Sequence, residues 1–358
     1  MESLEVNSGF WRGKKVLVTG HTGFKGAWLA LWLQRLGASV VGYALPAPTR
    51  PNMFDVASVG AGMVSIAGDV RKVEQLEAVL AEHQPAVIFH LAAQSLVRYS
   101  YANPVETYAT NVMGTVSLHE AVRRAECVRA IVIVTSDKCY ENREWIWGYR
   151  ENEAMGGYDP YSSSKGCAEL VTAAYRNSYF AKGHIAVASA RAGNVIGGGD
   201  WAEDRLIPDA VSAFIGRRPV EIRNPEAIRP WQHVLEPLSG YLLLAEKLHC
   251  NGQAYAESWN FGPNEADARA VGEVVGRMAE LWGEGARWRV AAGAHPHEAR
   301  SLKLDCTKAH ARLGWRPRLA LDQGIAWTAE WYRGWRDGMD MRPLSEAQIE
   351  RYESLTLS

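Results

Sequence analysis

The chain has 358 residues, of which 47% are hydrophobic and 22% are charged, and its formal net charge is −1. This length suggests about two domains with an ample core, and the balanced charge excludes a broad surface for nucleic acid or an acidic membrane. The five cysteines are scattered without a C-x-x-C pair, which argues against a zinc site or a disulfide framework and for a reducing cytoplasm. We expect neither a signal peptide nor a membrane span.

The first predicted elements are an apolar strand at 16–18, a glycine turn and a helix that begins near Ala27. The turn places Gly20, Gly23 and Gly26 at the spacing G-x-x-G-x-x-G. In such a unit the first glycine permits a tight turn, the second lets the backbone approach a pyrophosphate, and the third lets helix and strand pack closely. Exposed N–H groups and the helix dipole then favour a diphosphate. The pattern predicts a dinucleotide site, with an ordinary turn between packed elements as the alternative.

A second strand is expected at 39–44, where a dinucleotide fold normally ends in an acid that binds the adenosine ribose. This chain has Ala44 at that position. Thr49 could bind the ribose instead, and Arg50 would suit a 2′-phosphate. The second strand therefore leaves both NAD and NADP open.

Strands and helices then continue to alternate, which is typical of an α/β protein with a Rossmann-type doubly wound parallel sheet. Further strands are predicted at 63–70, 86–91 and 130–135, with helical segments at 72–83 and 104–124. Asp69 ends the third strand and could either accept the adenine amino group or cap the next helix. The small residues at 92–95 form a loop where the backbone would pass close to the cofactor.

The segment after the fifth strand begins Ser136-Asp137-Lys138, at the strand end where open α/β sheets bind their ligands. Tyr161 and Lys165 follow four residues apart, so a helix would present both on one face. A phenol is a poor base at neutral pH, but a neighbouring ammonium and a nicotinamide cation favour the phenolate. The pair could then take a hydroxyl proton while hydride leaves the same carbon for NAD, with Ser136 orienting that hydroxyl. The spacing alone arises by chance on helix surfaces, but with the glycine turn it predicts a catalytic site.

The second half of the chain is less regular. A sixth strand is predicted at 185–190, and the glycine-rich stretch 191–201 is expected to hold no element and to cross into a smaller domain. We expect a dinucleotide domain at 10–190 with returning segments near 228–262, and a mainly substrate-binding domain at 191–345. Within the latter part, the patterns predict a strand at 258–262 and amphipathic segments at 322–336 and 345–353, which would pack on the substrate domain or a subunit neighbour. The many late tryptophans are expected in buried packing.

The motifs together resemble the extended short-chain dehydrogenase/reductase family over almost the whole chain. The resemblance is carried by Thr19-Gly20-x-x-Gly23-x-x-Gly26, Asp69-Val70, Leu91-Ala92-Ala93, Asn111, Ser136 and Tyr161-x-x-x-Lys165. Within that family the chain is similar to nucleotide-sugar 4,6-dehydratases, through residues 20–26, 136–142 and 297–299. This implies bound NAD and a nucleotide-sugar substrate, with CDP-glucose the first choice. C4 would be oxidised, the C5 proton removed, the C6 hydroxyl expelled as water, and the hydride returned to C6.

The resemblance also implies a set of site residues. Cofactor contacts are expected from Gly20, Thr22, Gly23, Phe24, Lys25, Gly26, Asp69, Val70, Leu91, Ala92, Ala93, Asn111, Tyr161 and Lys165. Substrate contacts are expected from Gln94, Asn194, Leu206, Ile207, Arg229 and His297. The planar guanidinium of Arg229 can clamp a diphosphate, although a solvated turn is the alternative. The resemblance further implies a cytoplasmic homodimer or homotetramer in deoxysugar synthesis for O-antigen lipopolysaccharide.

Elimination of water needs an acid for the C6 oxygen and a base for C5. Asp137 is the candidate acid, provided that burial keeps it protonated. Lys138 stands where better-known dehydratases of this group have Glu. It could serve as the base only if desolvation lets it lose its proton, and otherwise it would stabilise the enolate while another group takes the proton. A solvated Asp–Lys pair without a catalytic role is the alternative.

Two other functions fit the same motifs. Nucleotide-sugar epimerases and decarboxylases use the same Ser136, Tyr161 and Lys165, but related epimerases lack acid–base residues at the next two positions, so Asp137 and Lys138 favour a dehydratase. A non-catalytic NAD(H)-sensing protein would need none of these groups, and the intact Tyr161 and Lys165 speak against it.

Overall fold

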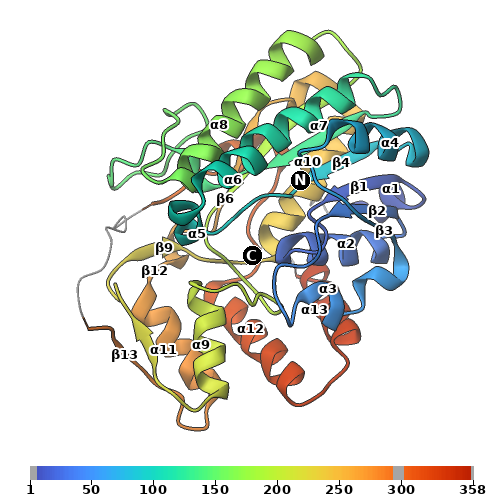
Figure 1. Cartoon of the computed structure of the whole chain (residues 1–358). Coiled ribbons are helices and arrows are strands. Elements are labelled where there is room, and N and C mark those ends of the chain that lie inside the picture. Colours follow the sequence, from blue (N-terminus) through green and yellow to red (C-terminus); the bar gives the residue numbers. More distant parts are fainter. Residues whose placement is uncertain (1–5, 293–301, 356–358) are drawn as a thin grey trace.

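The computed structural model describes residues 6–292 and 302–355 (Figure 1). Its centre is a seven-stranded sheet in the order β11-β6-β5-β4-β1-β2-β3, in which all neighbours run parallel. The strands are β1 (Lys15–Thr19), β2 (Ser39–Ala44), β3 (Val64–Ala67), β4 (Val87–His90), β5 (Ala130–Val134), β6 (Ala186–Ala192) and β11 (Ser258–Phe261). The strand order reverses between β1 and β4, and such a switch point creates a ligand-binding crevice. The predicted Rossmann-type α/β fold is confirmed.

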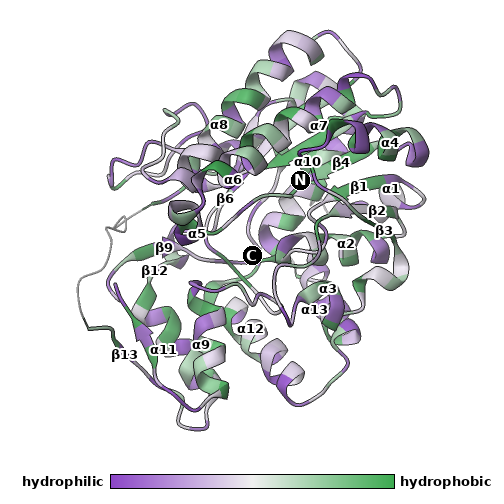
Figure 2. Cartoon of the chain, viewed as in Figure 1, coloured by the Kyte–Doolittle hydropathy of each residue, from purple (hydrophilic) through white to green (hydrophobic). Residues whose placement is uncertain are grey.

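Helices cover both faces of this sheet, so its central strands are largely apolar. Leu17 packs on one face with Ile88 and Ile131, whereas Val16 and Val18 pack on the other, as the pleat of a strand requires. The first face carries α4 (Val73–His83), α7 (Gly114–Arg123) and α8 (Pro160–Tyr175), and the second carries α2 (Phe24–Arg35) and α10 (Leu235–Asn251). Figure 2 shows hydrophobic residues concentrated in the strands, while the outer helices mix hydrophobic and hydrophilic positions.

The segment 104–124 is helical but interrupted. It consists of α6 (Pro104–Tyr108), a π-helical turn at Ala109–Met113, and α7. The short helix α5 (Val97–Ala102) precedes it. The π-helical turn carries Asn111, and such turns are often found at functional sites because they displace one residue from the regular helix.

A smaller group of elements follows β6 and lies below the sheet in Figure 1. Its members are β7 (Val195–Ile196), α9 (Leu206–Ile215), β8 (Val220–Ile222), β9 (Ile228–Pro230), β10 (Gln232–His233), β12 (Ala268–Ala270), α11 (Val271–Trp282) and β13 (Trp288–Val290). The expectation that 191–201 holds no element was wrong, because β6 extends to Ala192 and β7 pairs with β10. The carbonyls of Asn194 and Ile196 accept the N–H groups of Gln232 and Val234, which draws the glycine-rich stretch into this pair.

The C-terminal tail forms α12 (Leu321–Arg336) and α13 (Met341–Glu353). Helix α12 packs on α11, but α13 also packs on α2 of the sheet layer, which the sequence did not predict. The Trp32 indole donates to Glu353 over 2.8 Å, and Arg342 donates to the Ser58 carbonyl over 2.9 Å. The tail therefore contacts both the helices that cover the sheet and the smaller group of elements that follows β6. The late tryptophans predicted in packing include several buried ones, Trp282, Trp315, Trp327 and Trp331.

Two buried carboxylates of α10 hold the ends of the described chain. Glu236 accepts the backbone N–H groups of Arg318 and Leu319 and the Tyr352 hydroxyl. Glu246 accepts the Trp11 indole N–H over 2.7 Å. Burial raises the pKa of each carboxyl to about 7.

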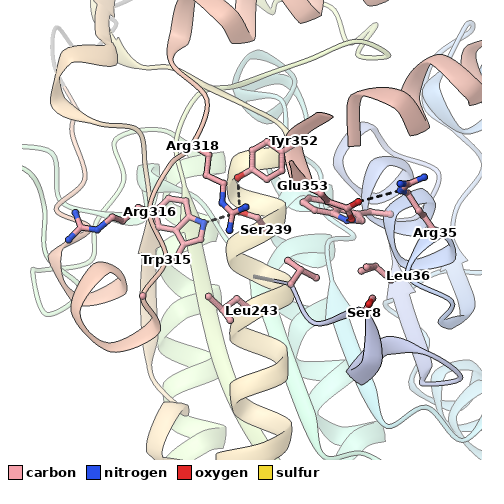
Figure 3. A pocket seen from close by; sticks show the side chains of 13 residues that line it. Ser8, Arg35, Leu36, Ser239, Leu243, Trp315, Arg316, Arg318, Tyr352 and Glu353 are labelled. Carbon is pink, nitrogen blue, oxygen red and sulfur yellow. Dashed lines mark hydrogen bonds and ion pairs between the residues drawn. The ribbon is translucent and has the colours of Figure 1, made fainter. Parts of the chain in front are cut away.

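A cavity of about 450 Å³ lies between these anchors, at the C-terminal end of α2 (Figure 3). Its walls include Trp32, Arg35, Ser239, Trp315 and Tyr352, several of which hydrogen-bond to one another or to Glu353. The glycine turn begins the opposite end of α2, so this cavity belongs to the packing of the chain ends. Within residues 6–292 and 302–355, every helix is too short or too polar to cross a membrane.

Candidate active site

The glycine turn has the geometry that its spacing predicts. Gly20 has φ +76°, and a Cβ at this position would lie 2.6 Å from the Ala92 nitrogen. A Cβ on Gly26 would lie 2.1 Å from the Gly20 carbonyl oxygen, so helix α2 can start against the turn only without a side chain there. Gly23 is the N-cap of α2 and offers no side-chain acceptor, which leaves the N–H groups of the first turn for an anion. This cradle fits the diphosphate of a dinucleotide.

The end of β2 has no ribose-binding acid, and its polar groups are arranged differently. Thr22 donates its hydroxyl to the Leu45 carbonyl over 2.9 Å. His21 lies against Gly42, and its Nε2 bonds to the Ser65 hydroxyl at 2.7 Å. Burial lowers the pKa of His21 to about 4, so the ring is neutral near pH 7.

Asp69 binds its own neighbour in the turn after β3. Its carboxylate accepts the guanidinium of Arg71 at 2.6–2.9 Å and the Arg71 backbone N–H at 2.9 Å. These hydrogen bonds lower the pKa of Asp69. The N-cap of α4 is Lys72, so the helix-cap alternative for Asp69 was wrong. Val70 is buried and packs against Gly114, where a Cβ would lie 2.9 Å from its methyl group.

Asn111 ties the loop after β4 to helix α8. It accepts the Gln94 N–H at 2.8 Å, donates to the Gln94 carbonyl at 2.9 Å, and donates to the Ser164 hydroxyl at 2.8 Å. The Gln94 side chain is itself bonded to Leu96 and Thr107 within the same loop. The predicted ligand contacts of both side chains therefore stay predictions, while their observed role is to position the loop Leu91-Ala92-Ala93.

The catalytic turn, as we call residues Ser136–Tyr140, follows β5 directly. The Ser136 hydroxyl caps its 3₁₀ turn by accepting the Lys138 N–H at 3.2 Å, and it donates to Asp137 Oδ1 at 3.0 Å. Burial raises the pKa of the Tyr161 phenol to about 12, and the neighbouring Ser136 side chain lowers it in part. The structure thus brings Ser136, Asp137 and Tyr161 together as predicted.

Helix α8 presents Tyr161 and Lys165 on one face. Asp159 caps this helix by accepting the Ser162 N–H at 2.9 Å, and Pro160 occupies its first position. The Lys165 ammonium donates to the Val134 carbonyl over 3.3 Å, at the end of β5. Burial lowers the pKa of Lys165 to about 8, which leaves the group mainly cationic at neutral pH.

Asp137 is the most deeply buried of the predicted acid–base groups. Only 2% of it is exposed, and Oδ2 has no hydrogen-bond partner among the described residues. A Cβ on Gly193 would lie 2.8 Å from this oxygen, so a glycine there leaves room beside it. Burial raises the pKa of Asp137, against the opposing effects of Lys138, Ser136, Lys25 and Arg229. A carboxyl group in this environment retains its proton more readily and can donate it.

Two cationic side chains, Lys25 and Arg205, also belong to the crevice, and the sequence analysis predicted only the first of them. Lys25 was predicted as a cofactor contact, and burial lowers its pKa to about 8, with Arg205 and Lys165 adding to the effect. Arg205 was missed, yet it donates to Asp200 at 2.7 Å and to the Ser95 hydroxyl at 2.9 Å. Its only signal in the sequence was a charged run directly before Leu206.

The predicted substrate residues are placed unevenly. Arg229 lies on β9, donates to the Ile228 carbonyl at 2.9 Å, and is near enough to Asp137 to act on its pKa. Asn194 follows β6 with its backbone in the β7–β10 pair. Ile207 is buried in the core, so its side chain packs instead of facing the crevice, whereas Leu206 is half-buried. His297 lies outside the described residues.

No three His, Cys, Asp or Glu side chains of the described segments come together in a way that could hold a metal ion. The site therefore consists of a diphosphate cradle, a tyrosine–lysine pair and a buried carboxyl at one crevice. That combination is typical of dinucleotide-dependent sugar-nucleotide enzymes of the short-chain dehydrogenase/reductase type.

Residues 17–328 match the sequence profile of the GDP-mannose 4,6 dehydratase family. The chain therefore belongs to this family, within the extended short-chain dehydrogenases/reductases, and the resemblance read from its motifs is confirmed.

The chain is also similar to individual proteins of known activity. A CDP-glucose 4,6-dehydratase of Salmonella typhimurium is 54% identical over 98% of this chain and 99% of its own length. A dTDP-glucose 4,6-dehydratase of Xanthomonas campestris is 27% identical over 88% of this chain and 92% of its own. Among solved structures, DesIV, a dTDP-glucose 4,6-dehydratase from Streptomyces venezuelae with NAD and TYD bound, has a TM-score of 0.78 at 26% identity. That comparison covers 92% of this chain and 99% of the other.

The close approach at Gly26 predicts a defect in cofactor binding. Gly26→Ala places a methyl group against the Gly20 carbonyl and forces the turn away from α2, so NAD should bind roughly tenfold more weakly. Calorimetric titration of the apo-protein with NAD measures this. Gly276→Ala is the matched control, because a Cβ there meets only the Trp288 ring at 3.5 Å and binding should not change. Equal NAD affinity in all three proteins would contradict the assigned cradle.

Proposed function

We propose that this chain converts CDP-glucose to CDP-4-keto-6-deoxyglucose and water with bound NAD. The observation that carries the proposal is the buried Asp137 carboxyl beside Ser136 and Tyr161. A plain dehydrogenase or an epimerase has no use for a carboxyl held toward its protonated form, whereas loss of the C6 hydroxyl requires an acid. The similarity to the CDP-glucose 4,6-dehydratase of Salmonella typhimurium supports CDP-glucose as the substrate.

The glycine turn would hold the diphosphate of NAD, with the loop Leu91-Ala92-Ala93 beside it. Bound NAD supplies a hydride acceptor for C4 and later a hydride donor for C6, so the reaction needs no outside reductant. Asn111 bonds to both that loop and α8, so the loop and the helix that carries Tyr161 would hold the cofactor between fixed elements.

Each catalytic residue then has one task. Tyr161 takes the proton of the C4 hydroxyl, and Ser136, which lies beside the phenol, orients that hydroxyl by a hydrogen bond. Lys165 favours the phenolate as a cation one helical turn away. Asp137 donates its proton to the departing C6 oxygen. Another group of the site takes the C5 proton, and Lys138, whose charge acts on Asp137, stabilises the enolate that this leaves. Arg229 binds the diphosphate of the substrate.

A cytoplasmic setting and a part in deoxysugar synthesis for O-antigen lipopolysaccharide belong to the same proposal. So does assembly into a homodimer or homotetramer. Helices α5, α6 and α8 and the π-helical turns next to them contact one another and expose large apolar side chains, namely Tyr99, Tyr101, Val105, Tyr108, Met113, Leu170 and Tyr179. An exposed apolar face of this kind is more stable when a second copy of the chain covers it than when it is exposed to water.

The function is tested by the product formed from CDP-glucose without added reductant. We expect the mass of the sugar nucleotide to fall by one water and no reduced nicotinamide to accumulate. An unchanged mass with CDP-glucose and with the other nucleotide-glucoses would contradict the dehydratase. An epimer detected by NMR would favour an epimerase, and NAD binding without any turnover would favour a sensor.

Asp137→Asn should separate the two halves of the reaction. The amide cannot protonate the leaving hydroxyl, so water loss should slow roughly 100-fold while C4 oxidation changes little. Reduced nicotinamide should then accumulate on the enzyme, visible by its near-ultraviolet absorbance after rapid mixing with CDP-glucose. Tyr161→Phe should instead prevent this reduction. Equal slowing of both halves in Asp137→Asn would remove Asp137 from the role of acid.

Leu170→Glu should weaken the assembly. Leu170 is 60% exposed on α8, and a carboxylate there would be buried without a partner in an interface, so the assembly constant should fall at least about tenfold. Analytical ultracentrifugation across a concentration series measures this. Val290→Glu is the control, because Val290 is also 60% exposed but lies on β13. An unchanged assembly in Leu170→Glu would exclude this face.

A further inference from the structure

A buried polar cluster lies beneath α8, on the face of the sheet that this helix covers. Its strand members are Thr135 after β5, Ser189 and Arg191 of β6, and Ser258 and Asn260 of β11. The register pairs Ser189 with Ser258 and Arg191 with Asn260. Because alternate residues share a face, these side chains all point toward α8. Apolar residues occupy the alternate positions on the opposite face, so the cluster is a local replacement of core by polar groups.

Glu169 of α8 is the centre of this cluster. Its Oε1 accepts the Thr135 hydroxyl at 2.5 Å, and its Oε2 accepts the Ser189 hydroxyl at 2.6 Å and the Arg191 guanidinium at 2.7 Å. The Glu169 and Arg191 side chains are each 3% exposed. Both carboxylate oxygens are thus bonded in a region without bulk water, which makes their directions specific.

Arg191 extends the cluster to the catalytic turn. It donates to the Tyr140 hydroxyl at 2.7 Å and lies over the Tyr140 ring, with the guanidinium carbon 4.9 Å from the ring centre. The Tyr140 hydroxyl in turn donates to Asn260 at 2.7 Å. Tyr140 is 1% exposed and ends the turn that carries Asp137.

The cluster therefore holds both catalytic segments from behind. Thr135 precedes Ser136, Tyr140 closes the catalytic turn, and Glu169 lies one helical turn after Lys165. A buried ion pair costs desolvation and is often no more stabilising than apolar residues of the same volume. Its location behind the catalytic atoms calls for an explanation other than stability.

We infer that Glu169 and Arg191 are positioning residues: their ion pair fixes the catalytic turn against α8, and the Glu169 carboxylate, one helical turn from Lys165, balances the charge of that ammonium group. This inference rests on the proposed function for its catalytic consequence. Glu169 does not itself lie at the crevice. The positioning effect of the cluster therefore reaches the substrate through the catalytic residues, Ser136, Asp137, Tyr161 and Lys165.

The charged groups around Lys165 support the inference that Glu169 balances the charge of this ammonium group. Glu169 on the same helix and Cys139 on the catalytic turn raise its pKa against the lowering by burial. Lys25 of α2 and His90 of β4 also face it, and burial lowers the pKa of His90 to about 3, so that ring carries no charge at neutral pH. Tyr161 lies one turn earlier. Glu169, whose charge is shared with its ion-pair partner Arg191, is the carboxylate that raises the pKa of Lys165 against burial.

Glu169→Gln tests the inference because it keeps the shape and removes the charge. Competitive acetylation of the apo-protein, followed by peptide mass spectrometry across a pH series, gives the pKa of Lys165 without any substrate. We expect this pKa to fall by about one unit. The alkaline limb of kcat for CDP-glucose should move to lower pH by the same amount, since Lys165 loses its proton earlier, while KM changes less than about twofold.

Glu236→Gln is the matched control. Glu236 is also a buried carboxylate with three donors, but it lies on α10, and its partners Arg318 and Tyr352 line the cavity of Figure 3. Its variant should lose thermal stability and leave the Lys165 titration and the pH profile unchanged. Identical Lys165 titration in the Glu169→Gln variant and the wild type would overturn the inference. A wild type inert toward CDP-glucose would refute the proposed function alone, because acetylation does not depend on it.

Tyr140→Phe tests whether the cluster positions the catalytic turn, and it can be used even if the Glu169→Gln protein does not fold. It removes only the hydroxyl that joins Arg191 to Asn260 and keeps the ring in its packing. We expect kcat to fall about tenfold with KM nearly unchanged, because the catalytic turn loses its support while substrate contacts remain. A kcat within about twofold of the wild type, in a folded Tyr140→Phe protein, would overturn the positional role.

Discussion

Desolvation at the carboxyl end of β5 is the condition on which the chemistry of this protein depends. The same burial pushes the pKa of Asp137 up and that of Lys165 down, because both charged forms lose water. The raised pKa of Asp137 favours the proton-donating form of this acid, while the lowering of the Lys165 pKa is opposed by Glu169. If Asp137 were exposed to water at this position, its carboxyl would be ionised near neutral pH and could not protonate a departing hydroxyl.

This burial has a structural cost that the surrounding fold offsets. Helix α8 lies so close to the catalytic turn that a Cβ on Gly166 would be 3.2 Å from the Cys139 carbonyl oxygen. Polar atoms enclosed at such a contact need partners, and Glu169 and Arg191 supply them on one side while Asn111 supplies them on the other. The hydrogen bonds that satisfy the buried groups also fix the distance between the tyrosine and the acid. Stability and catalytic geometry thus share the same contacts.

Much of this arrangement follows from local pattern. Apolar runs bounded by glycine predicted the strands, and the spacing of Gly20 and Gly26 predicted the cradle, because those features reflect sterics within a few residues. The pair Tyr161 and Lys165 was predictable for the same reason. The partners of Glu169 come from β5, β6 and β11, and no short-range pattern joins segments so distant in the sequence. Burial also decides more than residue type, as Ile207 shows by packing into the core instead of facing the crevice.

The central claim is that one crevice oxidises C4, removes water and reduces C6 in a closed cycle. CDP-glucose deuterated at C4 tests this most directly, with NMR of the product after incubation with the enzyme and no added reductant. The account predicts that the deuterium appears at C6 of a 4-keto-6-deoxy sugar. Deuterium retained at C4, or lost to bulk solvent, would contradict the internal transfer and with it the roles given to Tyr161 and Asp137.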